Sequence, residues 1–289
     1  MLKKLILSAL IITLIQGCSK DSDIPDEFAF DIALDLSKYT HTTYHEFPQP
    51  NSYEAFFNLN GTFSRLNSDH YPDVVPGYEL FEYDDSDRLV AIMIYSAEGA
   101  FLNDITYEYN ATNQLIKVTD NAAQSNPLNT IFTYNENEVT IFQEETGKSG
   151  SFIFDLDGKL IETTHDSGPS TVTRQEILYD NNNRVIEIKT FLNSDQFSST
   201  TFEYDDHANP FYETYVENSL IYFTRELFDV DFRGYSNFFS PNNVTTSITT
   251  GNDTRIDVRT FSYDNNGVPT NASTMRNGEL RSIEVFEYY

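Results

Sequence analysis

The chain has 289 residues, with 18 Lys and Arg against 45 Asp and Glu, which gives a net charge of −27 at pH 7. A surface this acidic repels phosphate groups, so we exclude nucleic-acid binding and attachment to anionic lipid headgroups through surface charge. The single cysteine excludes a disulfide framework. The length is sufficient for a sizeable core, and a composition rich in Tyr, Phe, Thr, Ile and Val favours β-strands.

The first residues have the pattern of a bacterial export signal. Two lysines precede an apolar run over 5–15, which is shorter than the about 20 residues that a membrane-spanning helix needs. The run ends in Ile-Gln-Gly-Cys at 15–18, which resembles the lipobox of bacterial lipoproteins. We therefore predict a signal peptide over 1–17 and lipidation of Cys18. The alternative is an ordinary secreted protein with one N-terminal cysteine.

The residues after Cys18 predict a tether. The segment 1–17 contains two lysines and no acids, so its removal makes the remaining chain still more acidic. Ser19, where an inner-membrane lipoprotein would have Asp, resembles lipoproteins released to the outer membrane. The acidic stretch 20–23 resembles short tags for export to the cell surface; the alternative is a solvated tether. We expect a tether over 18–27 and attachment to the outer membrane through acyl chains, on the periplasmic or the cell-surface side.

Residues 28–289 are expected to form a single domain, in which the part over 28–78 lacks the repeat described below. Its apolar segments at 28–30 and 53–63 could supply cap strands, or a short helix over one open end of the sheet.

Three histidines in this part could suggest a transition metal. His41 and His45 have the spacing that aligns two ligands on a helix, and His70 could add a third. However, the residues between His41 and His45 favour an extended chain, on which the two rings would lie about 13 Å apart. We therefore expect polar surface histidines and no metal site.

A repeat fills residues 79–289. Eight triplets place an aromatic or aliphatic residue two positions before an aromatic residue, and this spacing is the period of a β-strand. Both side chains of each triplet should lie on one face of a sheet, while the middle residue, which is Glu in four triplets, lies on the other. The triplets are Phe81-Glu82-Tyr83, Tyr107-Glu108-Tyr109, Phe132-Thr133-Tyr134, Phe152-Ile153-Phe154, Ile177-Leu178-Tyr179, Phe202-Glu203-Tyr204, Phe261-Ser262-Tyr263 and Phe286-Glu287-Tyr288.

Seven of the eight triplets are followed at once by Asp or Asn and then by a short polar patch. These residues tolerate positive φ and bond to their own backbone, as a tight turn requires. An aliphatic strand follows, so each unit predicts a β-hairpin. The last hairpin should turn at Asn277-Gly278.

The intervals between successive triplets predict the fold. Up to Tyr204 the triplets recur at short and nearly regular intervals, each of which has room for two strands and two turns but not for a helix between neighbouring strands. The longer interval from Tyr204 to Tyr263 should hold two units and an irregular piece around 228–243. We predict an all-β antiparallel meander of some sixteen strands in a strongly curved sheet, an open barrel or a short spiral, with the rings inside.

Two kinds of motif resemble known families. The Tyr-Asp-x-x-x-Arg-Leu cadence at Tyr83 to Leu89, and its variant at Tyr179 to Val185, resembles YD (Rhs) repeats. The segments 204–211, 240–244 and 263–269 resemble a family of uncharacterised outer-membrane lipoproteins with YD-like repeats. This resemblance implies an antiparallel β fold and an envelope location. It implies no activity and no site residues.

Four acids in the turns are weak candidates for calcium ligands, since this ion takes carboxylate and carbonyl oxygens. They are Asp84, Asp87, Asp155 and Asp157. The EF-hand pattern fails at the first step, because Leu160 stands where the loop from Asp155 needs glycine. Turn chemistry explains all four acids without a metal, and we expect no metal and no cofactor.

The sequence contains no motif of an enzyme class. There is no serine-hydrolase elbow, phosphate loop or dinucleotide fingerprint, and the only cysteine is assigned to lipidation. The many acids allow a glycosidase-like carboxylate pair but do not locate one, so catalytic residues are unknown. The pairs Asp84–Arg88 and Asp180–Arg184 are predicted to be ion pairs that span turns.

Exposed aromatic side chains could stack on sugars. The candidates, which could also belong to the core or its rim, are Tyr39, Tyr44, Tyr53, Tyr71, Tyr78, Tyr212, Tyr215, Tyr222 and Tyr235.

Three functions are compatible with these patterns. The favoured one is a non-catalytic envelope lipoprotein that serves as a scaffold or binding module for a protein or glycan ligand. The alternative is a polysaccharide-acting hydrolase with a carboxylate pair of raised pKa in the concavity of the sheet. The third is a small relative of toxin-shell proteins with a role in secretion or immunity.

Overall fold

The computed structural model describes residues 36–44, 51–68, 77–122, 127–168, 170–212, 215 and 239–289. The predicted signal peptide, Cys18 and the tether lie outside these residues. The described strands, in chain order, are β1 (Leu36–Thr43), β2 (Asn51–Phe57), β3 (Phe63–Ser68), β4 (Gly77–Tyr83), β5 (Leu89–Ser96), β6 (Phe101–Tyr109), β7 (Leu115–Asp120), β8 (Leu128–Asn135), β9 (Glu138–Gln143), β10 (Ser149–Phe154), β11 (Leu160–Gly168), β12 (Thr171–Tyr179), β13 (Val185–Leu192), β14 (Asp195–Ala208), β15 (Asn242–Thr250), β16 (Arg255–Tyr263), β17 (Pro269–Arg276) and β18 (Glu279–Tyr288).

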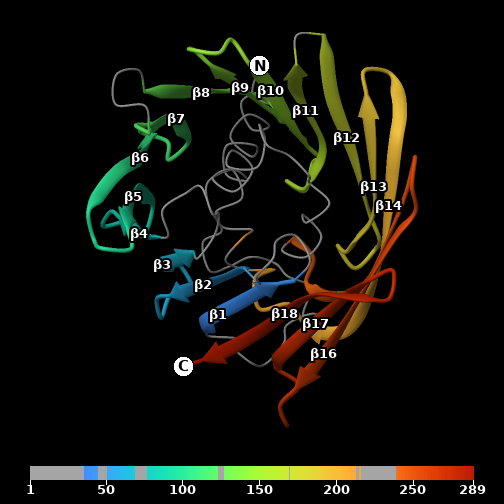
Figure 1. Cartoon of the computed structure of the whole chain (residues 1–289). Coiled ribbons are helices and arrows are strands. Elements are labelled where there is room, and N and C mark those ends of the chain that lie inside the picture. The colour runs from blue at the N-terminus through green and yellow to red at the C-terminus, as the bar shows by residue number, and fades with distance from the viewer. Residues whose placement is uncertain are drawn as a thin grey trace, which may run out of the picture.

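The eighteen strands form one closed barrel. Each strand pairs antiparallel with the next strand of the chain, and β18 returns to pair antiparallel with β1, for example Phe286 with Tyr39. Figure 1 shows the strands arranged in a ring. The predicted antiparallel meander is confirmed, and the expected curvature goes as far as full closure, which leaves no free edge strand in the described sheet.

Five turns at one end of the barrel share a conformation, and we call this end the Asp-turn end. The carboxylate or amide oxygen of the first turn residue accepts N–H groups two and four residues later; Asp180 Oδ1, for example, accepts from Asn182 at 2.8 Å and Arg184 at 3.0 Å. The fourth turn residue has a positive φ, as Gly, Asn and Asp tolerate. These fourth residues are Asp87 (57°), Asn113 (69°), Gly158 (82°), Asn183 (62°) and Gly267 (79°).

The second ring of most triplets is a tyrosine that ties neighbouring strands together. Its hydroxyl donates a hydrogen bond to the carbonyl of the first residue of the preceding strand. Burial raises the pKa of four of these hydroxyls, those of Tyr109, Tyr134, Tyr204 and Tyr288, so they remain protonated donors. The bonds are Tyr109 to Leu89 (2.9 Å), Tyr134 to Leu115 (2.8 Å), Tyr179 to Leu160 (2.8 Å), Tyr204 to Val185 (2.6 Å) and Tyr288 to Pro269 (2.8 Å).

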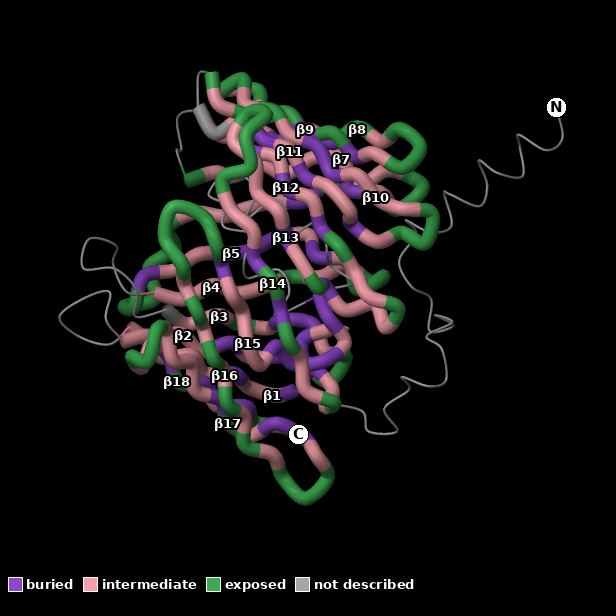
Figure 2. The backbone as a smooth tube through the Cα atoms, turned by 90° about the vertical axis from the view of Figure 1, so that its right-hand side faces the viewer, coloured by how far each residue is buried: buried purple, intermediate pink, exposed green. Residues whose placement is uncertain are grey.

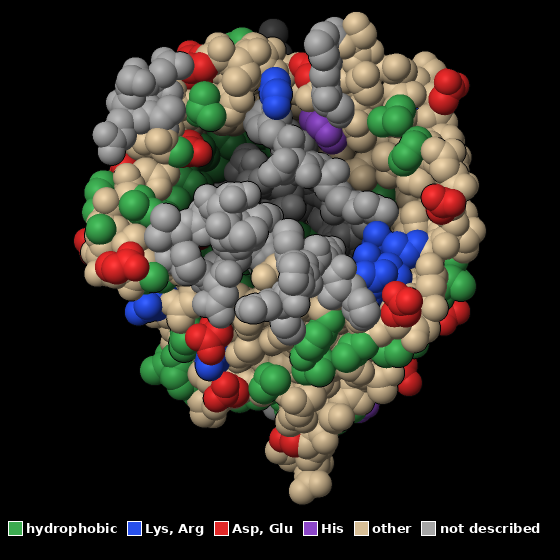
Figure 3. Space-filling model, viewed as in Figure 1, with side chains coloured by type: hydrophobic (Ala, Val, Ile, Leu, Met, Phe, Trp, Pro, Cys, Tyr) green, Lys and Arg blue, Asp and Glu red, His purple; other side chains and the backbone are tan. Residues whose placement is uncertain are grey.

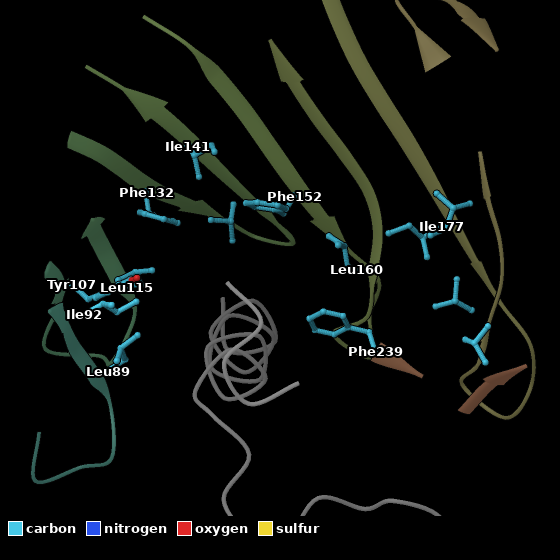
Figure 4. Packing of buried hydrophobic residues seen from close by; sticks show 14 of the residues in the cluster. Leu89, Ile92, Tyr107, Leu115, Phe132, Ile141, Phe152, Leu160, Ile177 and Phe239 are labelled. Carbon is cyan, nitrogen blue, oxygen red and sulfur yellow. The ribbon is translucent and has the colours of Figure 1, made fainter. Parts of the chain in front are cut away.

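The rings line the interior, as the alternation predicts. Phe132, Phe152 and Ile177 are each less than 5% exposed and belong to one large apolar cluster, whereas Phe286 and Tyr39 belong to a second. Figure 4 shows side chains of the large cluster pointing from separate strands toward the same central space.

The segment that joins β14 and β15 also contributes to the interior at its described ends. Phe211 packs in the second cluster, Phe239 in the first, and Tyr215 against both. Most of the irregular piece expected around 228–243 lies outside the described residues.

The interior changes character along the barrel axis. Apolar residues dominate toward the Asp-turn end, and buried polar side chains follow on the same strands toward the far end. In β11, for example, Leu160 at the start of the strand gives way to Thr163 and His165, and in β8 Phe132 is preceded by Thr130. The far end of the interior is therefore where polar chemistry is possible.

The outer wall carries charge. The middle glutamates of four triplets, Glu82, Glu108, Glu203 and Glu287, are exposed, and exposed apolar side chains such as Ile256 and Val258 also occur on this face. Figure 2 shows the wall from the side, and in Figure 3 acidic side chains are spread around the rim. A barrel that faces lipid has the opposite arrangement, with an apolar band outside.

The part of the chain without the repeat also forms barrel wall where it is described. Residues 36–43, 51–57 and 63–68 are β1 to β3, whereas 28–35, 45–50 and 69–76 lie outside the described residues. Within the described part of the chain, no helix is long and apolar enough to cross a membrane.

Candidate functional site

The ion pairs predicted to span turns are confirmed. Arg88 Nε lies 2.7 Å from Asp84 Oδ2, and Arg184 Nε lies 2.7 Å from Asp180 Oδ2. The hydrogen bond from Arg88 is the main cause that holds the pKa of Asp84 below its usual range. These carboxylates are turn anchors.

The four calcium candidates have turn partners. Asp84 and Asp155 each accept two backbone N–H groups of their own turn, and Asp87 accepts the side-chain amide of Asn60 at 3.3 Å. Asp157 donates its N–H to Asp155. Within the described ranges, no group of three or more His, Cys, Asp and Glu side chains is arranged to hold a metal.

The three segments that carry the lipoprotein resemblance meet at the Asp-turn end. The hydroxyls of Tyr204 and Ser240 lie 2.9 Å apart, and Asn209 bonds through its backbone N–H to Pro241 O at 2.9 Å and through its side chain to Ser240 O at 2.9 Å. These bonds fasten the two ends of the segment between β14 and β15 to each other.

The third segment completes the same cluster. Asp205 accepts hydrogen bonds from the hydroxyl of Tyr263 and the side chain of Asn243, and the ring of His207 stacks on Tyr263 with centroids 3.9 Å apart. A side chain on Gly267 would lie 3.2 Å from His207 Nδ1, which explains the glycine. The motif residues therefore form a structural clasp, because their polar groups bond to one another.

A different set of polar residues faces the interior near the far end, and we call it the polar sector. On β16, Arg255, Asp257 and Arg259 alternate with exposed residues and share a face with Phe261 and Tyr263. Neighbouring strands add further groups to this face. The polar sector consists of Arg255, Asp257, Arg259, Arg276, Arg281, Glu284, Tyr39, His41 and Tyr53.

At the centre of the polar sector is a buried ion pair. Arg259 Nε donates to Glu284 Oε1 at 2.9 Å, a second guanidinium nitrogen contacts Oε2, and the two side chains are 12% and 5% exposed. Burial, the largest single influence, would raise the pKa of Glu284, but the charges of Arg259 and His41 and the hydrogen bonds from Tyr39 and Arg259 together hold the pKa below its ordinary value. Tyr39 donates its hydroxyl to Glu284 Oε2 at 2.7 Å.

His41 lies in the same network, directly opposite Glu284 and Tyr53 in the strand register. Its Nδ1 is 3.2 Å from the hydroxyl of Tyr39 and 3.1 Å from that of Tyr53. Its Nε2 is buried and has no hydrogen-bond partner among the residues the structure describes. Burial is the main cause that lowers the pKa of His41, so the ring is neutral at pH 7. The expectation of a surface histidine is wrong for His41, because it shares the inner face with Tyr39; His45 and His70 lie outside the described residues.

Beyond this pair, two arginines hold one carboxylate at the rim of the far end, and a third arginine lies nearby. Arg255 Nε lies 2.9 Å from Asp257 Oδ2, and Arg276 Nε lies 2.7 Å from Asp257 Oδ1. Arg281 is paired with the exposed Glu279, at 3.6 Å. Burial is the main cause that lowers the pKa of Arg255, and the charges of Arg276 and Arg281 lower it further against the effect of Asp257.

The aromatic candidates for sugar stacking have different surroundings in the barrel. Tyr39, Tyr53 and Tyr215 pack in the interior. Tyr78 stacks on Tyr95 with centroids 5.1 Å apart. Tyr44 and Tyr212 are half-buried, whereas Tyr71, Tyr222 and Tyr235 lie outside the described residues.

Sequence reasoning missed Arg259 and Glu284, although the signal was present. Arg259 precedes the ring of Phe261 by two residues, and Glu284 precedes Phe286 by two. The alternation that placed the rings inside also places these charges inside. A charged residue two positions before a buried ring on the same strand is therefore the pattern that identifies the polar sector.

Comparison with known proteins finds solved structures of distant similarity. No protein-family model and no curated protein matches the chain. A porin-like protein from Bacteroides uniformis is 15% identical, aligns over 87% of this chain and 98% of its own, and gives a TM-score of 0.47. A Tc holotoxin pore from Photorhabdus luminescens is 12% identical, aligns over 82% of this chain but 13% of its own, and gives a TM-score of 0.32. Both TM-scores are too low for an argument about function, and membership of an outer-membrane lipoprotein family with YD-like repeats stays a prediction.

Proposed function

We propose that this chain is a non-catalytic, lipid-anchored protein of the bacterial outer membrane, and that its barrel is a scaffold or binding module for a protein or glycan ligand. The polarity of the barrel is the observation that carries the proposal. Rings line the interior and carboxylates such as Glu108 and Glu203 stand on the wall, so the wall suits water and not lipid. Membrane attachment would then depend on acyl chains at Cys18.

A binding role is supported by the uneven interior. Two apolar clusters occupy much of the described inner face, and the buried pair Arg259–Glu284 lies in the polar sector together with Arg255, Asp257 and Arg276. Charged groups that line a barrel mouth can orient a ligand without any reaction.

The hydrolase alternative gains no support from these residues. Asp257 and Glu284 are the carboxylates of the polar sector, and each is paired with arginine. A general acid needs a carboxyl group with a raised pKa. Every carboxyl pKa that shifts clearly among the described residues is lowered instead, and these groups are Glu54, Asp84, Glu145, Asp180, Asp264 and Glu284.

The anchor is tested by expressing the full chain in a Gram-negative host that is fed a labelled fatty acid. The wild type should carry the label and fractionate with the outer membrane. Cys18→Ala should lose the label and leave the membrane fraction, and Ser19→Asp should keep the label and move to the inner membrane. A labelled Cys18→Ala variant, or an unlabelled wild type, would refute the anchor at this position.

A further inference from the structure

The polar sector contains more positive charge than its own acids neutralise. Among the described residues, Arg255 and Arg276 share the single carboxylate of Asp257, and Arg281 has the exposed Glu279 as its ion-pair partner. Arg259 adds no charge because Glu284 compensates it. A local excess of cations is unexpected in a chain with a net charge of −27.

The three guanidinium groups keep donors available. Asp257 accepts from the Nε atoms of Arg255 and Arg276, and Arg281 Nε is buried without a partner among the described residues. A guanidinium has five N–H donors in a planar fork, so one carboxylate can occupy only a minority of the donors of three such groups. Asp257 thus holds the guanidinium groups of Arg255 and Arg276 on one side and leaves their other N–H donors for a ligand.

The position of the group makes it accessible. Arg255 is the first residue of β16, Arg276 is the last residue of β17, and Arg281 is near the start of β18. All three therefore lie at the far-end rim, on strands whose inner face continues into the barrel. Their side chains are 28–29% exposed, so a ligand in the mouth can reach them.

From this geometry, and building on the proposed binding role, we propose that the three arginines form a binding site for an oxyanion group, a carboxylate or a phosphate, of a ligand that enters the far end of the barrel. The planar forks match the two oxygens of such groups and form paired, charge-assisted hydrogen bonds. A neutral ligand group would leave the excess charge uncompensated. The acidity of the remaining surface would repel anions elsewhere, so binding should be confined to this site.

The test uses the mature chain and three probes at matched ionic strength: inorganic phosphate, glucuronate and, as a reference, chloride. Calorimetric titration should show saturable binding of phosphate, glucuronate or both, and none of chloride. Arg281→Gln and Arg255→Gln should each weaken that binding at least fivefold. Arg174→Gln is the matched control, because this arginine is also ion-paired and 31% exposed but lies on the outer wall beside Glu162 and Glu176; it should leave the affinity unchanged.

The phosphate and glucuronate titrations distinguish the two kinds of anionic ligand. Binding of glucuronate alone identifies a carboxylate ligand, and binding of phosphate alone a phosphate ligand. The proposal is overturned if neither probe binds above the chloride reference, or if Arg174→Gln lowers the affinity as much as Arg281→Gln does. Circular dichroism of each variant establishes that the barrel is folded. The proposed lipidation of Cys18 and membrane fractionation do not depend on the arginines. A negative binding result would therefore refute the oxyanion site without refuting the proposal of an anchored envelope protein.

Discussion

Removal of the negative charge of Glu284 should destabilise the barrel strongly. In Glu284→Gln the shape is kept and an amide oxygen remains for the hydroxyl of Tyr39, but Arg259 loses its compensating charge. Breaking a buried ion pair by changing one partner costs about 3–5 kcal/mol, and this pair qualifies because its side chains are 12% and 5% exposed. We expect a cost of about 3 kcal/mol or more in the free energy of unfolding.

The assay is urea denaturation followed by circular dichroism, with the midpoint compared at constant slope. Glu162→Gln is the control, since its carboxylate pairs with Arg174 on the outer wall and the side chains are 28% and 31% exposed; it should cost about 0–1 kcal/mol. Equal costs for Glu284→Gln and Glu162→Gln would refute the reasoning.

The same pair predicts a dependence on pH. Because the pKa of Glu284 is lower in the folded protein than its ordinary value of 4.5, the unfolded chain takes up the proton first as the pH falls. The stabilisation is therefore complete above the unfolded pKa and is lost as the pH falls through the folded pKa. Glu284→Gln should have a weaker loss of stability in this acidic range than the wild type.

Two further predictions concern backbone strain and buried histidines. Gly267→Ala should cost about 1 kcal/mol more than Gly158→Ala. Both have a positive φ (79° and 82°), but the new methyl group is crowded against His207 only at Gly267; equal urea midpoints would contradict this. The pKa values of His41 and His165 are lowered, with burial as the main cause, so the unfolded state binds protons first and stability should fall as the pH drops below about 6.5. Replacing either histidine with Gln should reduce that slope, as measured by thermal melts at pH 7.5 to 5.5, and an unchanged slope in the double variant would contradict it.

The hairpins were predictable because each is specified locally. A triplet such as Ile177-Leu178-Tyr179 sets the strand and its inner face, and Asp180 with Asn183 sets the turn. Closure was not predictable in the same way. It depends on how many strands the sheet has, and β1 to β3 were not recognised as repeat units. The turn after Phe57, at Asn58 to Gly61, nevertheless has the same backbone hydrogen bonds as the Asp-turns.

In the candidate site, too, contacts within one turn were predictable and contacts between distant strands were not. The turn acids were recognised correctly as ion pairs, since Asp84 and Arg88 are four residues apart in one turn. The pair Arg259–Glu284 belongs to a network that forms only after closure, because Tyr39 and Glu284 are 245 positions apart. Local patterns can place each of these charges on the inner face but cannot say which of them meet.

The pairing of β1 with β18 joins the first and the last described strands of the sheet, and the network of Tyr39, His41 and Glu284 lies on its inner side. Such a seam can form only when the last strand is present, and contacts between residues so distant in the sequence are slow to form. Until then β1 and β17 would both be open edges, which are prone to pair with other chains. A chain truncated before β18 should therefore be prone to aggregate, because it keeps these two edges open and lacks Glu284, the partner of Arg259.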